Sequence, residues 1–355
     1  MIKVTALISL YNSLEYVEQC LQDLVQQSLF KKGELELLVI DSNSPQDERA
    51  VVERFQARYD NIRYVRTAER ETLYQAWNTG LAHARGKYIT NANSDDRHHC
   101  ENLEILAKVL DNRHDIDLAY ADVFESTISN QTFADNPGTS RYVYPDFFAP
   151  LSLLFYQFGC QPLWRREVHD KIGLFDSVLR AAGDWEFCIR FSMAGLRAIR
   201  VPNVLGSFLH RPTSISTQDS VSTDEQRVLR ERYLNPGNIL ALYEKEGWGI
   251  QSSEEKAQIF SHFASLASNL KLPWQPGEIC RDVMAAVLAC VSAYEVDERK
   301  AQTAWNLGVA LQRASKLDAA VRYLVQGALS GRIESSRALD LYMRGESVDL
   351  PFVEL

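Results

Sequence analysis

Two hydrophobic periods alternate along the first third of the chain. Val4–Leu10 and Leu35–Ile40 are nearly continuous apolar runs, which is typical of strands buried on both faces of a sheet. Between them, apolar residues from Val17 to Val25 recur every three or four positions, which predicts a helix capped by Asn12 or Ser13. The alternation continues with strands at 62–65 and 88–90 and helices around 51–55, 72–85 and 103–110. This order predicts an α/β fold with a mostly parallel sheet covered by helices on both faces.

The rest of the chain changes character twice. Residues 119–212 are less regular and richer in aromatic residues, Pro and Gly, and from Thr223 onward the pattern is helical. We therefore predict two domains, at 1–222 and 223–355, the second of them all-α. Around residues 300–331 the spacing of small and apolar residues resembles one tetratricopeptide-like hairpin, although an ordinary helical hairpin fits it equally well. Such a domain suits binding of a protein partner or self-association.

Charge and composition exclude several classes of protein. The 355 residues include 38 Lys and Arg against 47 Asp and Glu, a net charge of −9 without basic runs, which argues against a nucleic-acid partner. The six cysteines form no CxxC pair, so we interpret them as free thiols in a reducing compartment. No signal peptide is evident, and the longest apolar stretch falls short of the ~20 residues of a transmembrane helix. We expect a soluble cytoplasmic protein, or one peripheral to the inner face of the membrane.

Carboxylates stand where two predicted strands end. Asp41 follows the second strand, and Asp95 and Asp96 follow the fourth. Ligands of open α/β sheets bind beyond the carboxyl ends of the strands. Adjacent carboxylates repel each other unless a cation compensates, and Mg²⁺ or Mn²⁺ binds carboxylate together with phosphate oxygens. The pair therefore predicts a site for a metal and a diphosphate, whereas Asp41 alone could simply cap the next helix.

Several segments resemble those of a known enzyme family. In chain order they read ALISLYN (6–12), LVIDSNS (38–44), LYQAWNTG (73–80), ARGKYI (84–89), NANSDD (91–96), GDWE (183–186) and HRPTSIS (210–216). Over residues 4–216 the chain resembles the family 2 inverting glycosyltransferases, which have the Rossmann-like GT-A fold.

This resemblance implies a role for each matching residue. The residues implied at the nucleotide-sugar donor are Leu10, Tyr11, Asn12, Asp41, Asn78, Asn93 and Asp95. Among these, Asp41 would bind the base, usually uracil. Asn93 stands where many relatives have the first Asp of a DxD motif, which lowers the negative charge of the site.

The resemblance also implies metal, base and acceptor residues. Asp96 and His210 would bind Mn²⁺ or Mg²⁺, although His210 could equally be a strand-end histidine bonded to backbone. Asp184 matches the general base. Trp185 and Glu186 would face the acceptor, with core packing and a helix-start carboxylate as the respective alternatives.

These residues predict an inverting glycosyltransferase. The family resemblance implies a UDP-sugar as donor and a hydroxyl of a glycan or lipid-linked molecule as acceptor. Single displacement needs only a base and a cation for the leaving diphosphate, and the residues above would supply both. A nucleotidyltransferase on a similar fold would carry a glycine-rich basic loop after the first strand, and residues 10–15 have none. A non-catalytic nucleotide-sugar or carbohydrate binder, with the helices as a docking module, would not need Asp184.

Overall fold

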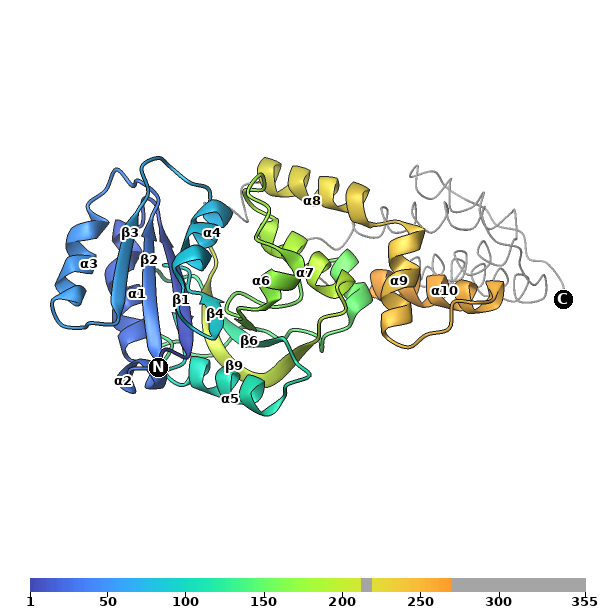
Figure 1. Ribbon diagram of the computed structural model, residues 1–355, viewed down its shortest axis with the longest axis horizontal. Helices are drawn as coiled ribbons and strands as arrows, with labels where there is room; N and C mark the ends of the chain where they lie inside the picture. The colour runs from blue at the N-terminus through green and yellow to red at the C-terminus, as the bar shows by residue number, and fades with distance from the viewer. Residues whose placement is uncertain (212–218, 270–355) are drawn as a thin grey trace. The chain divides into compact units, whose positions relative to one another are not determined.

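The computed structural model describes residues 1–211 and 219–269 (Figure 1). Contacts divide the chain into two compact units, one of residues 1–147 and 156–227, the other including the described residues 148–155 and 228–269. The predicted domain boundary at 222/223 stays a prediction, because much of the helical domain, with the hairpin at 300–331, lies outside the described residues.

A nine-stranded sheet forms the centre of the first unit, as far as the described residues show it. The strands are β1 (Val4–Leu10), β2 (Leu35–Asp41), β3 (Ile62–Arg66), β4 (Tyr88–Asn91), β5 (Arg97–His98), β6 (Leu118–Ser126), β7 (Arg141–Tyr142), β8 (Leu163–Arg165) and β9 (Ala198–Leu209). Their order is β3-β2-β1-β4-β8-β6-β9-β5, with β7 beside β6. The first four strands are parallel to one another, β6 and β9 are parallel, and β8 joins the two groups by antiparallel pairing.

Helices cover both faces of the parallel strands, as predicted. They are α1 (Leu14–Val25), α2 (Ser28–Lys31), α3 (Glu48–Gln56), α4 (Leu73–His83), α5 (Asn102–Asn112), α6 (Val168–Ile172) and α7 (Gly183–Met193). Alternate β1 residues such as Ala6 and Ile8 join the core formed with α1, α3 and α5. The intervening Leu7 faces α4 on the opposite side, where Figure 1 shows this helix.

Local sequence fixes where α4 begins and how closely it packs. Thr72 and Gln75 form a capping box, in which the Thr72 side chain accepts from the Gln75 N–H and the Gln75 side chain accepts from the Thr72 N–H. At Gly80 a Cβ atom would lie 2.8 Å from Leu7 Cδ2 and 2.9 Å from Ile40 Cδ1. Glycine therefore lets α4 approach the sheet directly beside the strand ends.

The described part of the second unit is helical. It contains the 3₁₀ helix η1 (Ala149–Leu153), α9 (Pro236–Lys245) and α10 (Ser253–Asn269), and α8 (Asp219–Tyr233) runs from the first unit into it. Its core includes Tyr243, whose hydroxyl lies 2.7 Å from His262 Nδ1, packed with Phe263. Across residues 1–211 and 219–269, no helix has the length and apolar character needed to cross a bilayer.

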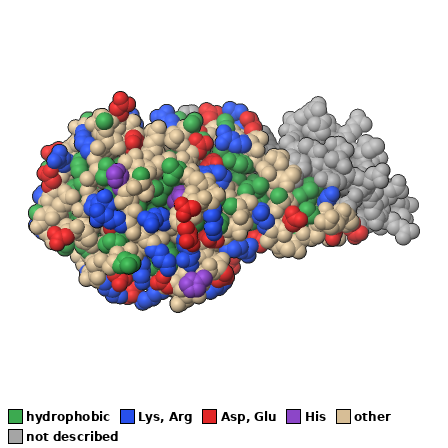
Figure 2. Space-filling view, in the orientation of Figure 1, with side chains coloured by type: hydrophobic (Ala, Val, Ile, Leu, Met, Phe, Trp, Pro, Cys, Tyr) green, Lys and Arg blue, Asp and Glu red, His purple; other side chains and the backbone are tan. Residues whose placement is uncertain are grey.

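Charged side chains of both signs are interspersed over the face shown in Figure 2. The blue Lys and Arg side chains alternate there with red Asp and Glu side chains. On this face, therefore, neither sign of charge forms a large separate patch.

Candidate active site

The loops that follow β1, β2 and β4 all leave the sheet at the carboxyl ends of these adjacent strands. Parallel pairing sets Leu10 of β1 opposite Asp41 of β2, and Leu7 opposite Asn91 at the end of β4. The predicted donor segments, which are distant in sequence, therefore start from adjacent strand ends.

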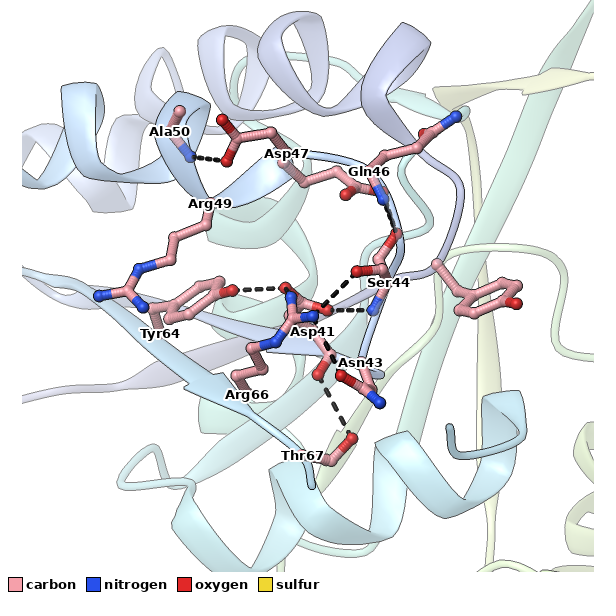
Figure 3. Close-up of polar contacts among 12 residues, drawn as sticks. Asp41, Asn43, Ser44, Gln46, Asp47, Arg49, Ala50, Tyr64, Arg66 and Thr67 are labelled. Carbon is pink, nitrogen blue, oxygen red and sulfur yellow. Dashed lines mark hydrogen bonds and ion pairs between the residues drawn. The ribbon is translucent and has the colours of Figure 1, made fainter. Parts of the chain in front are cut away.

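Asp41 is fully buried, and both of its carboxylate oxygens are engaged (Figure 3). Oδ1 accepts a hydrogen bond from the Ser44 N–H at 2.8 Å, while Oδ2 accepts from the Tyr64 hydroxyl and from Arg66 Nη1. Arg66 also donates to Asn43 Oδ1 at 3.0 Å and to the Ser44 carbonyl at 2.9 Å. Burial, followed by the bond to Asp41, raises the pKa of Tyr64 to about 12, so this hydroxyl stays a donor.

The loop after β1 is tied to the loop after β2. Leu10 is buried, Asn12 has a positive φ of 52°, and its N–H donates to Ser44 Oγ at 3.0 Å. Beside them, the guanidinium carbon of Arg70 lies 4.0 Å from the centre of the Tyr11 ring. Tyr11 and Asn12 thus project from a loop whose backbone is fixed.

Glu48, at the start of α3, strengthens this connection. Its Oε1 accepts from the Ser13 N–H and from the Ser44 hydroxyl, both at 2.8 Å, and the side chain is buried. One carboxylate therefore joins the start of α1 to the loop that holds Asp41.

Asp96 and Asp95 follow β4 and differ in their surroundings. Asp96 is 2% exposed; its Oδ2 accepts from Asn93 Nδ2 at 3.0 Å and its Oδ1 from the Leu209 N–H at 3.1 Å. Burial and the neighbouring charge of Asp95 raise the pKa of Asp96 to about 8. Asp95 instead forms an ion pair with Arg211. The site thus holds a buried carboxylate, Asp96, that accepts hydrogen bonds from uncharged groups, beside Asp95, which is paired with an arginine.

The carboxylates fit a divalent cation that takes its remaining ligands from phosphate and water. Mg²⁺ in particular is commonly bound by one or two carboxylates together with substrate phosphates. Within the described ranges, no group of three or more His, Cys, Asp and Glu side chains is placed to hold a metal by itself. His210 is exposed, and its backbone N–H donates to the Ser126 carbonyl at 2.7 Å. The centre of its imidazole ring lies 6.5 Å from the centre of the Phe208 ring.

Asp184 lies in the first turn of α7 and is partly buried. Its Oδ1 accepts from the Tyr74 hydroxyl of α4 at 3.1 Å and from the Trp185 N–H at 2.8 Å. Burial raises the pKa of Asp184 to about 6, against the lowering effect of these hydrogen bonds. A Cβ atom on Gly183 would lie 2.6 Å from the Tyr74 ring, so glycine permits this contact. The result is a carboxylate poised to exchange a proton near neutral pH.

Three other predicted residues are held inside the first unit. Asn78 forms a pair of hydrogen bonds with the Phe175 backbone, Nδ2 to the carbonyl at 2.9 Å and the N–H to Oδ1 at 3.0 Å. Trp185 is 5% exposed, and the buried Glu186 accepts from Arg190 Nε at 2.7 Å. In this structure these side chains support the fold around Asp184, and their roles toward donor or acceptor stay predictions.

A pocket of about 480 Å³ opens between the β3–α4 loop and the segment before α7. Its walls are Thr67, Ala68, Glu69, Arg70, Glu71, Gln75, Asn78 and Ser177. This polar recess includes Asn78 from the predicted donor set and Arg70, which lies over Tyr11.

The comparison with protein families decides the class of enzyme. The family model described as "Glycosyl transferase family 2" matches residues 5–181, which include the loops around Asp41 and Asp96 and end just before Asp184. Residues 5–181 belong to glycosyl transferase family 2. Over this segment the protein is thus a family 2 glycosyltransferase, which confirms the predicted family and the predicted enzyme class.

Curated relatives of this family 2 glycosyltransferase are distant. Glycosyltransferase AglE of Haloferax volcanii is 25% identical over 214 residues, covering 59% of this chain and 67% of AglE. The uncharacterized glycosyltransferase EpsJ of Bacillus subtilis is 22% identical over 220 residues, covering 60% of this chain and 62% of EpsJ.

A solved structure supports the fold. Staphylococcus aureus TarS 1–349, crystallised with UDP-GlcNAc, aligns with a TM-score of 0.57 at 18% identity, covering 99% of this chain and 97% of that chain. At this identity the likeness concerns the fold, and it confirms the predicted GT-A-like, mostly parallel α/β sheet of the family 2 domain.

Sequence reasoning missed several partners of the site residues in this family 2 domain. Arg66 had a usable signal, because the pairing of β2 with β3 sets it directly opposite Asp41. Tyr74 lies within the recognised 73–80 segment, but its bond to Asp184 spans 110 positions of sequence. Such long-range contacts leave no mark on local spacing.

Proposed function

We propose that the protein transfers a sugar from a UDP-sugar to a hydroxyl of a glycan or lipid-linked acceptor, with inversion at the anomeric carbon. The observation that carries this proposal is Asp184 at the start of α7, bonded to Tyr74, with its pKa raised to about 6. A family 2 enzyme that works by single displacement needs one such group and no covalent intermediate.

Asp184 is the proposed general base. A pKa of about 6 leaves it ionised at neutral pH yet basic enough to take a proton from an acceptor hydroxyl as that oxygen attacks. The bonds from Tyr74 and from the Trp185 N–H both fall on Oδ1, so we assign proton acceptance to Oδ2.

The two carboxylates after β4 are the proposed place for the donor diphosphate. Asp96, assisted by Asp95, would hold Mn²⁺ or Mg²⁺, and His210 remains a candidate ligand at the end of β9. A bound divalent cation neutralises the charge that develops on the leaving nucleoside diphosphate. Arg211 adds a fixed positive charge beside Asp95.

The proposed nucleoside site is the frame around Asp41. Asp41 is the proposed contact to the base through its match to the family motif, its carboxylate is bonded to Arg66 and Tyr64, and Tyr11 and Asn12 belong to the adjoining loop. UDP is the favoured nucleotide because Asp41 matches the uracil-binding position of the family and because the TarS structure contains UDP-GlcNAc.

Release of nucleoside diphosphate tests this function. The full chain is incubated with UDP-GlcNAc, UDP-glucose, UDP-galactose or GDP-mannose, with and without Mn²⁺, with water or a glycan mixture as acceptor. We expect a UDP-sugar to give the fastest release and the product to show the opposite anomeric configuration by proton NMR. Retained configuration, or release from none of the four donors, would contradict the proposal.

A further inference from the structure

A glutamate of α8 binds the chain segment that leads into α7. Glu225 Oε1 accepts from the Arg180 N–H at 2.7 Å, and Oε2 accepts from the N–H groups of Ala181 and Ala182 at 2.8 and 2.9 Å. Three consecutive backbone N–H groups on one carboxylate form a nest, an arrangement that binds anions. Bonds to an ionised acceptor are about twice as strong as neutral ones.

The segment held by Glu225 determines where Asp184 lies. Ala182 is the N-cap residue of α7, its carbonyl accepts from the Glu186 N–H at 3.0 Å, and Asp184 comes two residues later. A shift of residues 180–182 would therefore carry the first turn of α7 with it. It would also change the 3.1 Å bond between Tyr74 and Asp184.

We propose that Glu225 is a positioning residue for the transfer reaction, which fixes Asp184 by clamping residues 180–182 from α8. The inference rests on the proposed function, in which Asp184 is the base. It adds a group that lies outside the matched family segment 5–181 and outside every motif recognised in the sequence.

Glu225 also acts on Asp184 through its charge. The titratable groups that face Asp184 are Tyr74 of α4, Tyr156, Cys188 of α7 and Glu225 of α8. Burial raises the pKa of the first three, so they are neutral at pH 7. After burial, which is the main cause, the negative charge of Glu225 contributes to the raised pKa of Asp184. Removing that charge should make Asp184 more acidic.

Hydrogen exchange tests the clamp without any substrate. In the full chain, Glu225→Ala should make the amides of residues 180–182 exchange about tenfold faster or more, since each loses a charge-assisted bond. Asp224→Asn is the matched control, because it removes a charge from the adjacent and exposed α8 position and should leave these amides unchanged. Unchanged exchange in Glu225→Ala would overturn the clamp.

Kinetics test the effect on Asp184. The assay measures release of the nucleoside diphosphate from UDP-GlcNAc, or from the one of the four donors that reacts fastest. Glu225→Ala should lower kcat about tenfold or more with a nearly unchanged donor KM, because small displacements of a base are costly. Glu225→Gln should also move the acidic limb of the pH–rate profile to lower pH. Glu225→Asp, which keeps the charge but is shorter, should lower kcat while leaving the limb near its wild-type position.

The outcomes separate this inference from the proposed function. If Asp184→Asn is inactive but all Glu225 variants keep the wild-type kcat and pH profile, the positioning role is wrong and the base assignment stands. If Asp184→Asn retains turnover, the base assignment itself is wrong, and the role of Glu225 falls with it.

Discussion

Asp184 owes its proposed role to its surroundings more than to its residue type. A solvent-exposed aspartate has a pKa too low to be an effective base, whereas burial at the start of α7 raises the pKa of Asp184 to about 6. The same burial also affects the stability of the fold. Because the folded-state pKa lies above the unfolded value, ionised Asp184 lowers stability, and this cost grows as the pH rises from about 4 to 6.

Replacing Asp184 by asparagine should separate catalysis from binding. Asp184→Asn keeps the shape of the side chain but cannot accept a proton, so UDP release should fall by ~10² or more while the donor KM changes little. In the wild type, release should decline as the pH falls through about 6, since protonated Asp184 cannot act as a base.

The matched control for this substitution is Asp170→Asn, which changes an exposed carboxylate on α6 and should leave release unchanged. Near-normal turnover in Asp184→Asn would place the base elsewhere.

Asp96 should be required for the metal. Asp96→Asn removes the buried carboxylate after β4, and both Mn²⁺ stimulation and most of kcat/KM, by ~10² or more, should be lost. Excess EDTA should abolish release by the wild type, and Mn²⁺ should restore it. Asp60→Asn, an exposed change in the turn before β3, is the control. Full activity in EDTA would instead assign charge neutralisation to basic groups such as Arg211.

At the scale of elements, the site depends on contacts between helices that lie far apart in the sequence. Hydrophobic periodicity was enough to predict β1, β2 and β4 and the helices between them, because each is buried on a regular face. It could not predict that α4 supplies Tyr74 to Asp184, or that α8 supplies Glu225 to residues 180–182. Those contacts depend on tertiary packing, which a single sequence does not encode in its local spacing.

Because Tyr74 of α4 packs directly against Gly183 at the start of α7, we expect position 183 to accept no larger residue. In Gly183→Ala the new Cβ would lie 2.6 Å from the buried Tyr74 ring, so the ring or the start of α7 must move. We expect a loss of about 1–3 kcal/mol in unfolding free energy and a lower kcat. Gly237→Ala in α9, where the nearest atom would be 3.5 Å away, serves as the control for denaturant unfolding and UDP release. Wild-type values for Gly183→Ala would refute the close contact.

At the scale of the whole molecule, composition and pattern predicted the order in which α/β and helical segments follow one another. The α/β pattern up to residue 110 corresponds to strands of the sheet and to the helices that cover it. In the helical part, Leu229, Leu240 and Phe260 lie in helices. The pattern gave no indication that 148–155 belongs with residues 228–269, because η1 is a short segment that carries no periodicity.

Removing the C-terminal helices should leave donor chemistry in place. A chain ending at Leu234 keeps every proposed donor and base residue, so UDP release should persist, while any oligomer or native-acceptor activity is lost. The buried apolar residues of η1 and the segment after it, such as Leu153, would lose the cover of α9, so the melting temperature should fall. Loss of donor binding in a soluble truncated chain would show instead that the helices belong to the catalytic core.

The antiparallel insertion of β8 has a consequence for biosynthesis. β4 ends at Asn91, but β8, its neighbour on the far side from β1, begins at Leu163. As the chain leaves the ribosome from its N-terminus, the first four strands can assemble through short βαβ connections while β4 keeps an open edge. That edge remains available to other nascent chains until the residues up to 165 have left the ribosome, and edge pairing competes with folding during that interval. The time for which the edge of β4 stays open is therefore set by the position of β8 in the gene.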